Sequence, residues 1–181
     1  MNVRGMVMAV TVSLALVATS AAAVSLGKGT SEFSGFVGFK STSTSGTSAS
    51  GVSFDAEYGY FMTPNWEIAP GIEIGSESSD GSTVSDHAGL LSGIYNFPRS
   101  GDLIPYARAG IGFGRTSSGG KSIGFMTLPQ VGAGVRYIKW KTAALNGCVY
   151  YQRTELSKRA DNATSNTVGV RVGVSWFPKG F

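Results

Sequence analysis

The 181-residue chain has one cysteine, one histidine and few charged residues, and each scarcity excludes a class of site. Cys148 has no second cysteine with which to form an intrachain disulfide, so it is interpreted as a small packing residue. His87 alone cannot supply a multi-histidine metal site. Lysine and arginine nowhere form the dense basic stripe typical of nucleic-acid binding. The composition therefore predicts no cofactor and no nucleic-acid partner.

Long apolar runs are also scarce, and the clearest one lies at the N-terminus. Arg4 precedes an apolar segment at Met6–Val17, and Ala21–Ala23 then supplies the small residues of a cleavage site. This pattern predicts a signal peptide over residues 1–23, cut before Val24. The alternative is a membrane anchor, but the run is short for a helical span of about 20 apolar residues. Residues 24–181 are then expected to form one domain.

What the chain does contain is an alternation of apolar and polar residues. In the segment 168–176, four valines and Trp176 share one face of a predicted strand, and Arg171, Gly173 and Ser175 share the other. The same division recurs along the chain. A barrel with a lipid-facing outside and a wet inside would produce this pattern.

Eight segments are predicted to be strands, and they define the fold class as all-β, an eight-stranded antiparallel up-and-down transmembrane β-barrel. The segments are 32–40, 51–62, 66–76, 84–97, 105–115, 123–137, 142–153 and 166–177. Four connections, mostly rich in Ser, Thr and Gly, are expected to form longer loops at one end, over 41–50, 77–83, 116–122 and 154–165. Shorter turns would lie at the opposite, periplasmic end together with both termini. Pro70 and Pro129 predict a bulge or an unpaired strand end.

The inward phase of these strands collects charges of both signs. The predicted lumen network consists of Asp55, Glu57, Glu67, Glu73, Arg108, Arg136 and Arg171. The same phase turns Glu32, Lys40 and Glu77 inward, and in the fourth strand we favour Leu91 outside. An eight-stranded barrel is narrow and filled by side chains. Nearly equal numbers of acidic and basic side chains in its lumen therefore predict a plug held together by salt bridges. A gated ion path is the alternative.

Aromatic residues gather where the predicted short turns lie. The expected girdle at the membrane boundary consists of Trp66, Tyr95, Phe97, Tyr137, Trp140 and Trp176. Phe113, Phe125 and Tyr151 are expected to form a sparser girdle toward the other end.

Four segments carry a family resemblance: residues 93–98, 105–114, 131–137 and 168–176. They resemble the small eight-stranded outer-membrane barrels, the OmpA/OmpX-like group. The resemblance implies a location in the outer membrane of a Gram-negative bacterium, with outer-membrane lipid and, during insertion, the barrel-assembly machinery as partners. We expect a monomer, and the extracellular partner is unknown. One departure is Pro178, which takes the outward position after Trp176, so the insertion signal is read through Trp176 or with a shifted tail ending at Phe181.

Two further patterns point only weakly to nucleotide binding and to catalysis. The segment Gly114–Ser122 resembles a phosphate-binding loop but has five residues between its glycines instead of four, and no helix follows. His87 with Ser85 and Asp86 could form a triad of the kind found in outer-membrane lipid A hydrolases, although a solvated histidine is favoured.

The leading hypothesis is therefore a structural or surface-interaction barrel without catalysis. Its last loop, with Lys158, Arg159 and Asp161, would meet the outside. The alternatives are a narrow pore for ions or small solutes, a lipid enzyme using His87, and a soluble β-barrel that binds a small apolar ligand with its apolar face inward.

Overall fold

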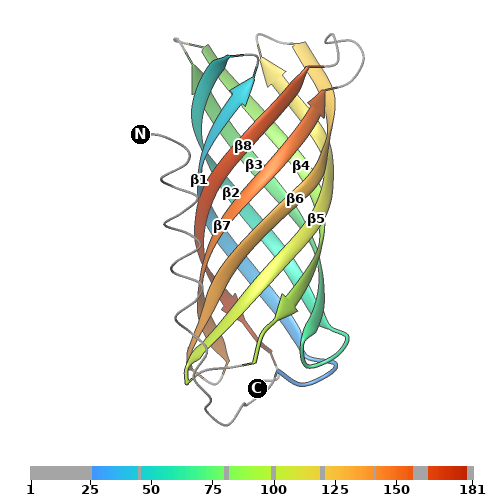
Figure 1. The fold of residues 1–181 in the computed structure, drawn as a ribbon, viewed down its shortest axis with the longest axis vertical. Helices are drawn as coiled ribbons and strands as arrows, with labels where there is room; N and C mark the ends of the chain where they lie inside the picture. Colours follow the sequence, from blue (N-terminus) through green and yellow to red (C-terminus); the bar gives the residue numbers. More distant parts are fainter. Residues whose placement is uncertain are drawn as a thin grey trace.

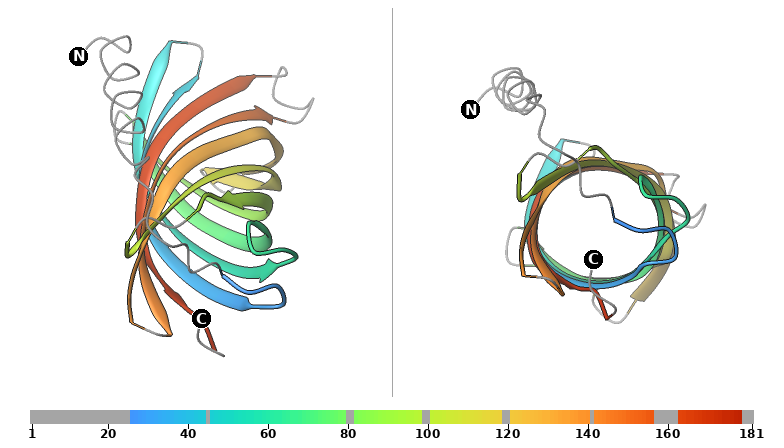
Figure 2. Two further views of the ribbon diagram at one scale, coloured as in Figure 1. Left: turned by 60° about the horizontal axis from the view of Figure 1, so that its bottom comes forward. Right: turned by 90° about the horizontal axis from the view of Figure 1, so that it is seen from below.

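Eight antiparallel strands close into a single barrel in the computed structural model (Figures 1 and 2). The structure describes residues 26–44, 46–79, 82–98, 101–118, 121–140, 142–156 and 163–178. The strands are β1 (Ser31–Thr44), β2 (Thr47–Phe61), β3 (Trp66–Ser79), β4 (Ser82–Asn96), β5 (Leu103–Ser118), β6 (Lys121–Trp140), β7 (Ala143–Leu156) and β8 (Thr164–Trp176). Each strand pairs with the next, and β1 pairs with β8. The predicted eight-stranded up-and-down barrel is confirmed.

The two ends of the barrel are named by the chain termini. β1 begins and β8 ends at the lower end in Figure 1, called the terminal end below, and the upper end is called the distal end. The predicted signal peptide, over residues 1–23, and the tail at 179–181 lie outside the described residues. Within the described residues, no helix has the length and apolarity needed to cross a bilayer.

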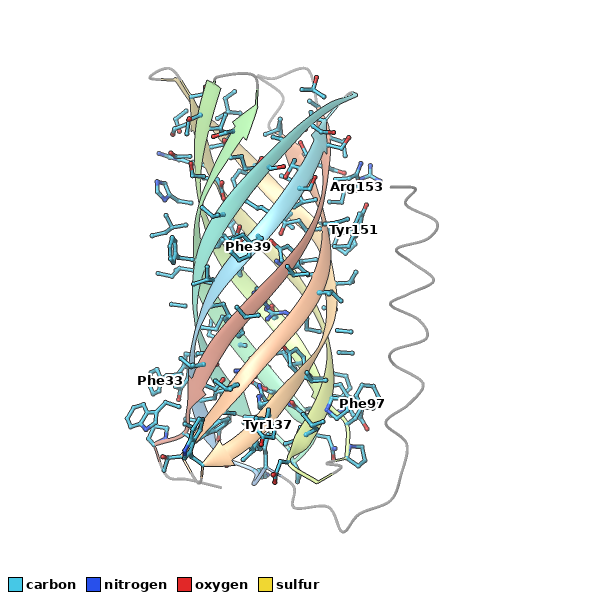
Figure 3. The ribbon with its side chains drawn as sticks, turned by 90° about the vertical axis from the view of Figure 1, so that its left-hand side faces the viewer. Phe33, Phe39, Phe97, Tyr137, Tyr151 and Arg153 are labelled. Carbon is cyan, nitrogen blue, oxygen red and sulfur yellow. The ribbon has the colours of Figure 1, made fainter. Side chains whose placement is uncertain are left out.

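The alternating pattern places the apolar side chains on the outside. In β8, Val172 and Val174 are 58% and 59% exposed, whereas Arg171 between its valine neighbours is 3% exposed. In β4, Leu91 faces out and Leu90 faces in, as expected. Figure 3 shows labelled rings such as Phe39 and Tyr151 on the outer surface. Charges inside and bare hydrophobic groups outside are the arrangement that a lipid environment stabilises.

The strands extend further toward the distal end than the sequence predicts. The expected loop 41–50 is mostly strand, because β1 runs to Thr44 and β2 begins at Thr47. The expected loops 77–83 and 116–122 are likewise taken up by strand ends. Hydroxyl pairs continue the pairing, with Thr42 Oγ1 2.8 Å from Thr167 Oγ1 and Thr44 Oγ1 2.6 Å from Ser165 Oγ. Ser and Thr in these segments thus act as strand residues, and the predicted contrast between long and short connections is wrong for three of the four distal connections.

Both prolines sit where the pairing between strands is disturbed. Leu128 and Pro129 together oppose one residue on each neighbouring strand, which makes a bulge in β6 between Thr127 and Gln130. Pro70 lies in a short gap in the pairing of β2 with β3, between the paired residues Ile68 and Gly71. The register is the same on both sides of this gap. The β6 bulge reverses the facing of the strand beyond it, so the prediction that Phe125 faces outward is wrong. Phe125 faces the lumen.

Candidate functional site in the barrel lumen

The terminal end of the lumen is closed by an apolar floor. Phe61 and Phe177 are fully buried there. The whole cluster consists of Leu26, Phe61, Ile104, Ile138, Ala144 and Phe177. These residues take the inward positions at strand ends or lie just beyond the strands. The sequence signal is an apolar residue in inward phase at the terminal end, which the lumen prediction did not use.

Directly above the floor, Arg136 joins two carboxylates and three aromatic rings. Its Nη2 lies 2.8 Å from Glu32 Oε2 and 3.3 Å from Glu67 Oε2. The guanidinium carbon is 5.5–5.9 Å from the ring centroids of Phe61, Tyr106 and Phe177. Arg136 is 3% exposed. Since a buried charge is stable only with partners, these contacts lock the end of the lumen.

Polar side chains complete this Arg136 cluster. Arg136 Nη1 donates to Asn96 Oδ1 at 2.8 Å, and Asn96 Nδ2 donates to Glu67 Oε2 at 3.2 Å. Ser34 Oγ donates to Glu32 Oε1 at 2.7 Å, and Ser175 donates to the same carboxylate. The cluster therefore draws on strands from around the whole barrel wall.

A second cluster is centred on Glu57 in the middle of the barrel. Arg108 donates two hydrogen bonds to its carboxylate, at 3.2 and 2.9 Å, and a third to Ser92 Oγ at 2.6 Å. Arg171 Nη1 donates to Glu57 Oε1 at 3.1 Å and lies 4.0 Å from Asp55 Oδ2. The Arg171 guanidinium also lies 4.7 Å from the centre of the Phe36 ring. Glu57 thus bridges two arginines, and Asp55 is held more loosely.

A third cluster, nearest the distal end, is centred on Lys40. Its Nζ lies 3.4 Å from Glu73, 3.1 Å from Glu77 and 3.0 Å from Asp86. Three carboxylates surround one ammonium group, so this cluster carries an excess of two negative charges when all four groups are ionised. The side chains of Glu77 and Asp86 retain 19% and 13% exposure, against 5% for Glu73.

The structure places all seven residues of the predicted lumen network inside the barrel, where Asp55, Glu57, Glu67, Glu73, Arg108, Arg136 and Arg171 are 2–7% exposed. They fall into three clusters instead of one network. The predicted network leaves out Glu32 and Lys40, although the strand phase turns both inward. It also leaves out Asp86, which the sequence suggests only as a neighbour of His87. The ion pairs join side chains from strands that are not neighbours in the barrel, such as β2 and β8. The inward or outward facing of a residue does not specify its partner in such a pair.

Beyond the Lys40 cluster, the lumen opens into a cavity of about 510 Å³, called the cup below. Lys40, Glu73, Glu77 and Asp86 form one part of its lining, on β1, β3 and β4. Ile123, Phe125 and Leu156 form another part, on β6 and β7. The acidic side also carries apolar residues of β4, and the rest of the wall is mostly Thr and Ser hydroxyls with Ala49 and Gln152; the apolar residues of β4 are Val84, Ala88 and Leu90. The cup therefore has an acidic side and an apolar side.

The predicted girdle residues lie on or beside the outer surface at the terminal end. Trp66, Trp140 and Trp176 are each 53% exposed, and Phe97 is 42% exposed. Tyr95 contacts Trp66 and Phe97 at ring-centroid distances of 5.1 and 5.0 Å, and Tyr137 is half-buried. Figure 3 shows Phe97 and Tyr137 near this end together with Phe33, which the prediction had turned outward but left out of the girdle.

The structure separates Asp86 from the other two residues of the possible catalytic triad, Ser85 and His87. His87 and Ser85 are exposed on the outer face of β4, whereas Asp86 points into the lumen and accepts hydrogen bonds from Lys40 at 3.0 and 3.1 Å. Cys148 is buried beside Tyr106, Ile94 and Ala69. Among the described residues, no three His, Cys, Asp or Glu side chains are grouped so as to hold a metal ion. The segment that resembles a phosphate loop is largely the end of β5 and the start of β6.

Solved structures share the architecture. The crystal structure of Neisserial surface protein A matches with a TM-score of 0.65 and 19% identity, covering 81% of this chain and 96% of that one. The attachment invasion locus protein Ail of Yersinia pestis matches with a TM-score of 0.51 and 16% identity, covering 82% and 99%. A second Ail structure, in complex with the heparin analogue sucrose octasulfate, gives a TM-score of 0.53 at the same identity and coverage. A comparison with curated proteins gave no match.

At these identities the solved structures support the fold alone. The sequence itself matches the family described as "Outer membrane protein beta-barrel domain" over residues 6–176, which is nearly its whole length. Together with the closed barrel and its apolar exterior, this match shows that the chain belongs to the outer membrane protein beta-barrel domain family.

Proposed function

We propose that this protein is a structural or surface-interaction barrel of the Gram-negative outer membrane, with its lumen plugged and without catalytic activity. The observation that carries the proposal is the stacking of the apolar floor, the Arg136 cluster and the Glu57 cluster across the lumen. Opening a water-filled path would require several buried ion pairs to separate together, and each separated charge would lose its partner in a poorly solvated interior.

The proposal includes the position of the chain in the envelope. Both described ends of the barrel chain lie at the terminal end, which would face the periplasm after cleavage of a signal peptide over residues 1–23. The distal end would then face the outside. The last predicted loop, with Lys158, Arg159 and Asp161, lies largely outside the described residues. The exposed apolar belt would contact lipid directly, and one closed barrel is complete as a monomer.

Fractionation combined with a heat-modifiability gel tests the location. The full chain is expressed with its N-terminal segment, and its migration is compared with and without boiling. We expect recovery in the outer membrane and a boiling-dependent shift, because a closed barrel resists detergent until it is heated. Soluble recovery without a shift would contradict the proposal.

Planar-bilayer recording tests the plug. The refolded barrel is expected to leave the bilayer silent, and a conducting porin added afterwards shows that the bilayer could report a channel. Discrete conductance steps from the purified barrel would instead favour the narrow pore.

A further inference from the structure

We propose that the cup is a binding site for a small organic cation with an apolar body. This inference goes beyond the proposed structural role and concerns a part of the lumen that the plug does not use. The cavity of about 510 Å³ lies within the range of about 300–1,000 Å³ typical of small-molecule sites. Small eight-stranded barrels are wide enough to hold one such ligand.

The first argument for a cation is the charge of the Lys40 cluster. Lys40 neutralises one of the three carboxylates around it, and among the described residues no other lysine or arginine lines the cup. The two carboxylates nearest the cavity, those of Glu77 and Asp86, keep more exposure than the side chain of Glu73. Their oxygen atoms are therefore the groups that an entering ammonium or guanidinium would meet, and charge-assisted hydrogen bonds would hold it.

The second argument is the apolar side of the cup, and it comes from the bulge in β6. Because Leu128 and Pro129 occupy one register position together, the distal half of β6 turns Ile123 and Phe125 inward. Leu156 on β7 extends this apolar side. β6 and β7 are four strands away from β2 and β3 in the closed order, so the apolar side lies across the lumen from Glu73 and Glu77.

These two sides together specify the ligand class. A simple metal ion does not fit, since the Lys40 ammonium lies between the carboxylates and no metal-binding group of three is formed by the described residues. A purely apolar ligand would exclude water from carboxylates whose summed negative charge Lys40 alone does not balance, which is unfavourable. A molecule with a cationic head and a short apolar body satisfies both sides.

The test measures binding to the full barrel in lipid nanodiscs by isothermal titration calorimetry, with empty nanodiscs as the baseline. The probes are hexylammonium, hexanol and hexanoate, which share one apolar body and differ in the charge of the head. We expect hexylammonium to bind at least about tenfold more tightly than hexanol. A tenfold difference in affinity corresponds to the free energy that one hydrogen bond to a charged group contributes. Hexanoate is expected not to bind.

Matched variants locate the site. Glu77→Gln is expected to weaken hexylammonium binding about tenfold, whereas Glu155→Gln, which removes a carboxylate that is 64% exposed outside the cup, is expected to leave it unchanged. Ala49→Phe adds a ring inside the cup and should abolish binding, whereas Ala109→Phe adds the same ring to the outer face. A boiling-dependent gel shift for each variant shows that the barrel is folded, so loss of binding is distinguished from loss of structure.

Three outcomes would overturn the proposal. Equal binding of hexanol and hexylammonium would mean that the cup selects no charge. Preferential binding of hexanoate would make Lys40 the recognition group and reverse the assignment. Heat no greater than that of empty nanodiscs, from barrels that pass the gel test, would mean that the cup is not a site for this class. None of these results affects the proposed location or the plug.

Discussion

The terminal and distal halves of the lumen are built by the same alternating strands but have opposite interiors. The terminal half is filled, because its inward positions carry large side chains such as Phe61, Tyr106 and Arg136. The distal half is open, because many inward positions carry small ones such as Thr42, Ala49 and Ala88. Since the strand number sets the diameter of the barrel, the volume of the inward side chains decides which half is solid.

The two halves also differ in how their charges are satisfied. Arg136 and Glu57 are each bonded to several partners and have side chains no more than 4% exposed. Glu77 has a side chain that is 19% exposed and borders open space. Stability should therefore depend on the terminal half, and any ligand specificity on the distal half.

The largest effect is expected from Arg136→Ala. The change leaves Glu32 and Glu67 buried without their cation and removes three ring contacts. We expect the free energy of unfolding to fall by about 5 kcal/mol. Urea unfolding in lipid vesicles, followed by tryptophan fluorescence, measures the change. The control is Arg153→Ala, whose ion pair with Glu155 is half-exposed and should contribute less than about 1 kcal/mol. Equal losses in the two variants would erase the contrast between buried and exposed pairs.

Phe61→Ala tests the floor against the cup wall. Phe61 is fully buried, and its removal leaves a cavity that should cost about 4 kcal/mol. Phe125→Ala should cost only about 1 kcal/mol, because that ring already borders the cup. The same urea titration reports both. If Phe125→Ala proved as damaging as Phe61→Ala, the distal half would be packed as tightly as the terminal half.

Within the Glu57 cluster, two carboxylates of similar burial should differ. Glu57→Gln removes the charge that bridges Arg108 and Arg171, so we expect a loss of about 3 kcal/mol. Asp55→Asn should cost less than about 1 kcal/mol, because Asp55 lies 4.0 Å from Arg171, its Oδ1 has no hydrogen-bond partner among the described residues, and asparagine brings no charge into the interior. A larger loss from Asp55→Asn than from Glu57→Gln would show that Asp55 holds the cluster.

The sequence predicted the barrel well because its strongest signal is strictly local. A period of two needs only the chain itself, so the facing of Arg171 among its valine neighbours could be inferred without knowing any partner strand. Ion pairs across the lumen could not be inferred this way. Glu57 meets Arg171 from β8 only because of the register and tilt of strands far apart in the chain.

The errors in the distal half have a common origin. Ser41–Thr44 and Thr47–Ser50 were expected to be loops from their composition, yet threonine is also a favourable strand residue and the hydroxyls pair across strands. Phe125 was assigned to the outside although Pro129 had already indicated a bulge. A bulge at Pro129 shifts the phase of β6 by one residue, which turns Ile123 and Phe125 into the lumen and leaves Met126 outside.

Among the four principal substitutions, Arg136→Ala, Phe61→Ala, Glu57→Gln and Thr42→Val, the smallest effect is expected from Thr42→Val in the distal half. Thr42 Oγ1 donates to Glu77 Oε1 at 2.9 Å and lies 2.8 Å from Thr167 Oγ1, but valine keeps the shape and strand preference of threonine. In the variant, the Glu77 carboxylate keeps its ion pair with Lys40 at 3.1 Å and its partial exposure to the cup. We therefore expect the free energy of unfolding to fall by only about 1 kcal/mol. Thr83→Val on the outer face is the matched control and should change less. A loss near that of Arg136→Ala would mean that the distal hydroxyls hold the barrel closed, and stability would then be shared evenly along the lumen.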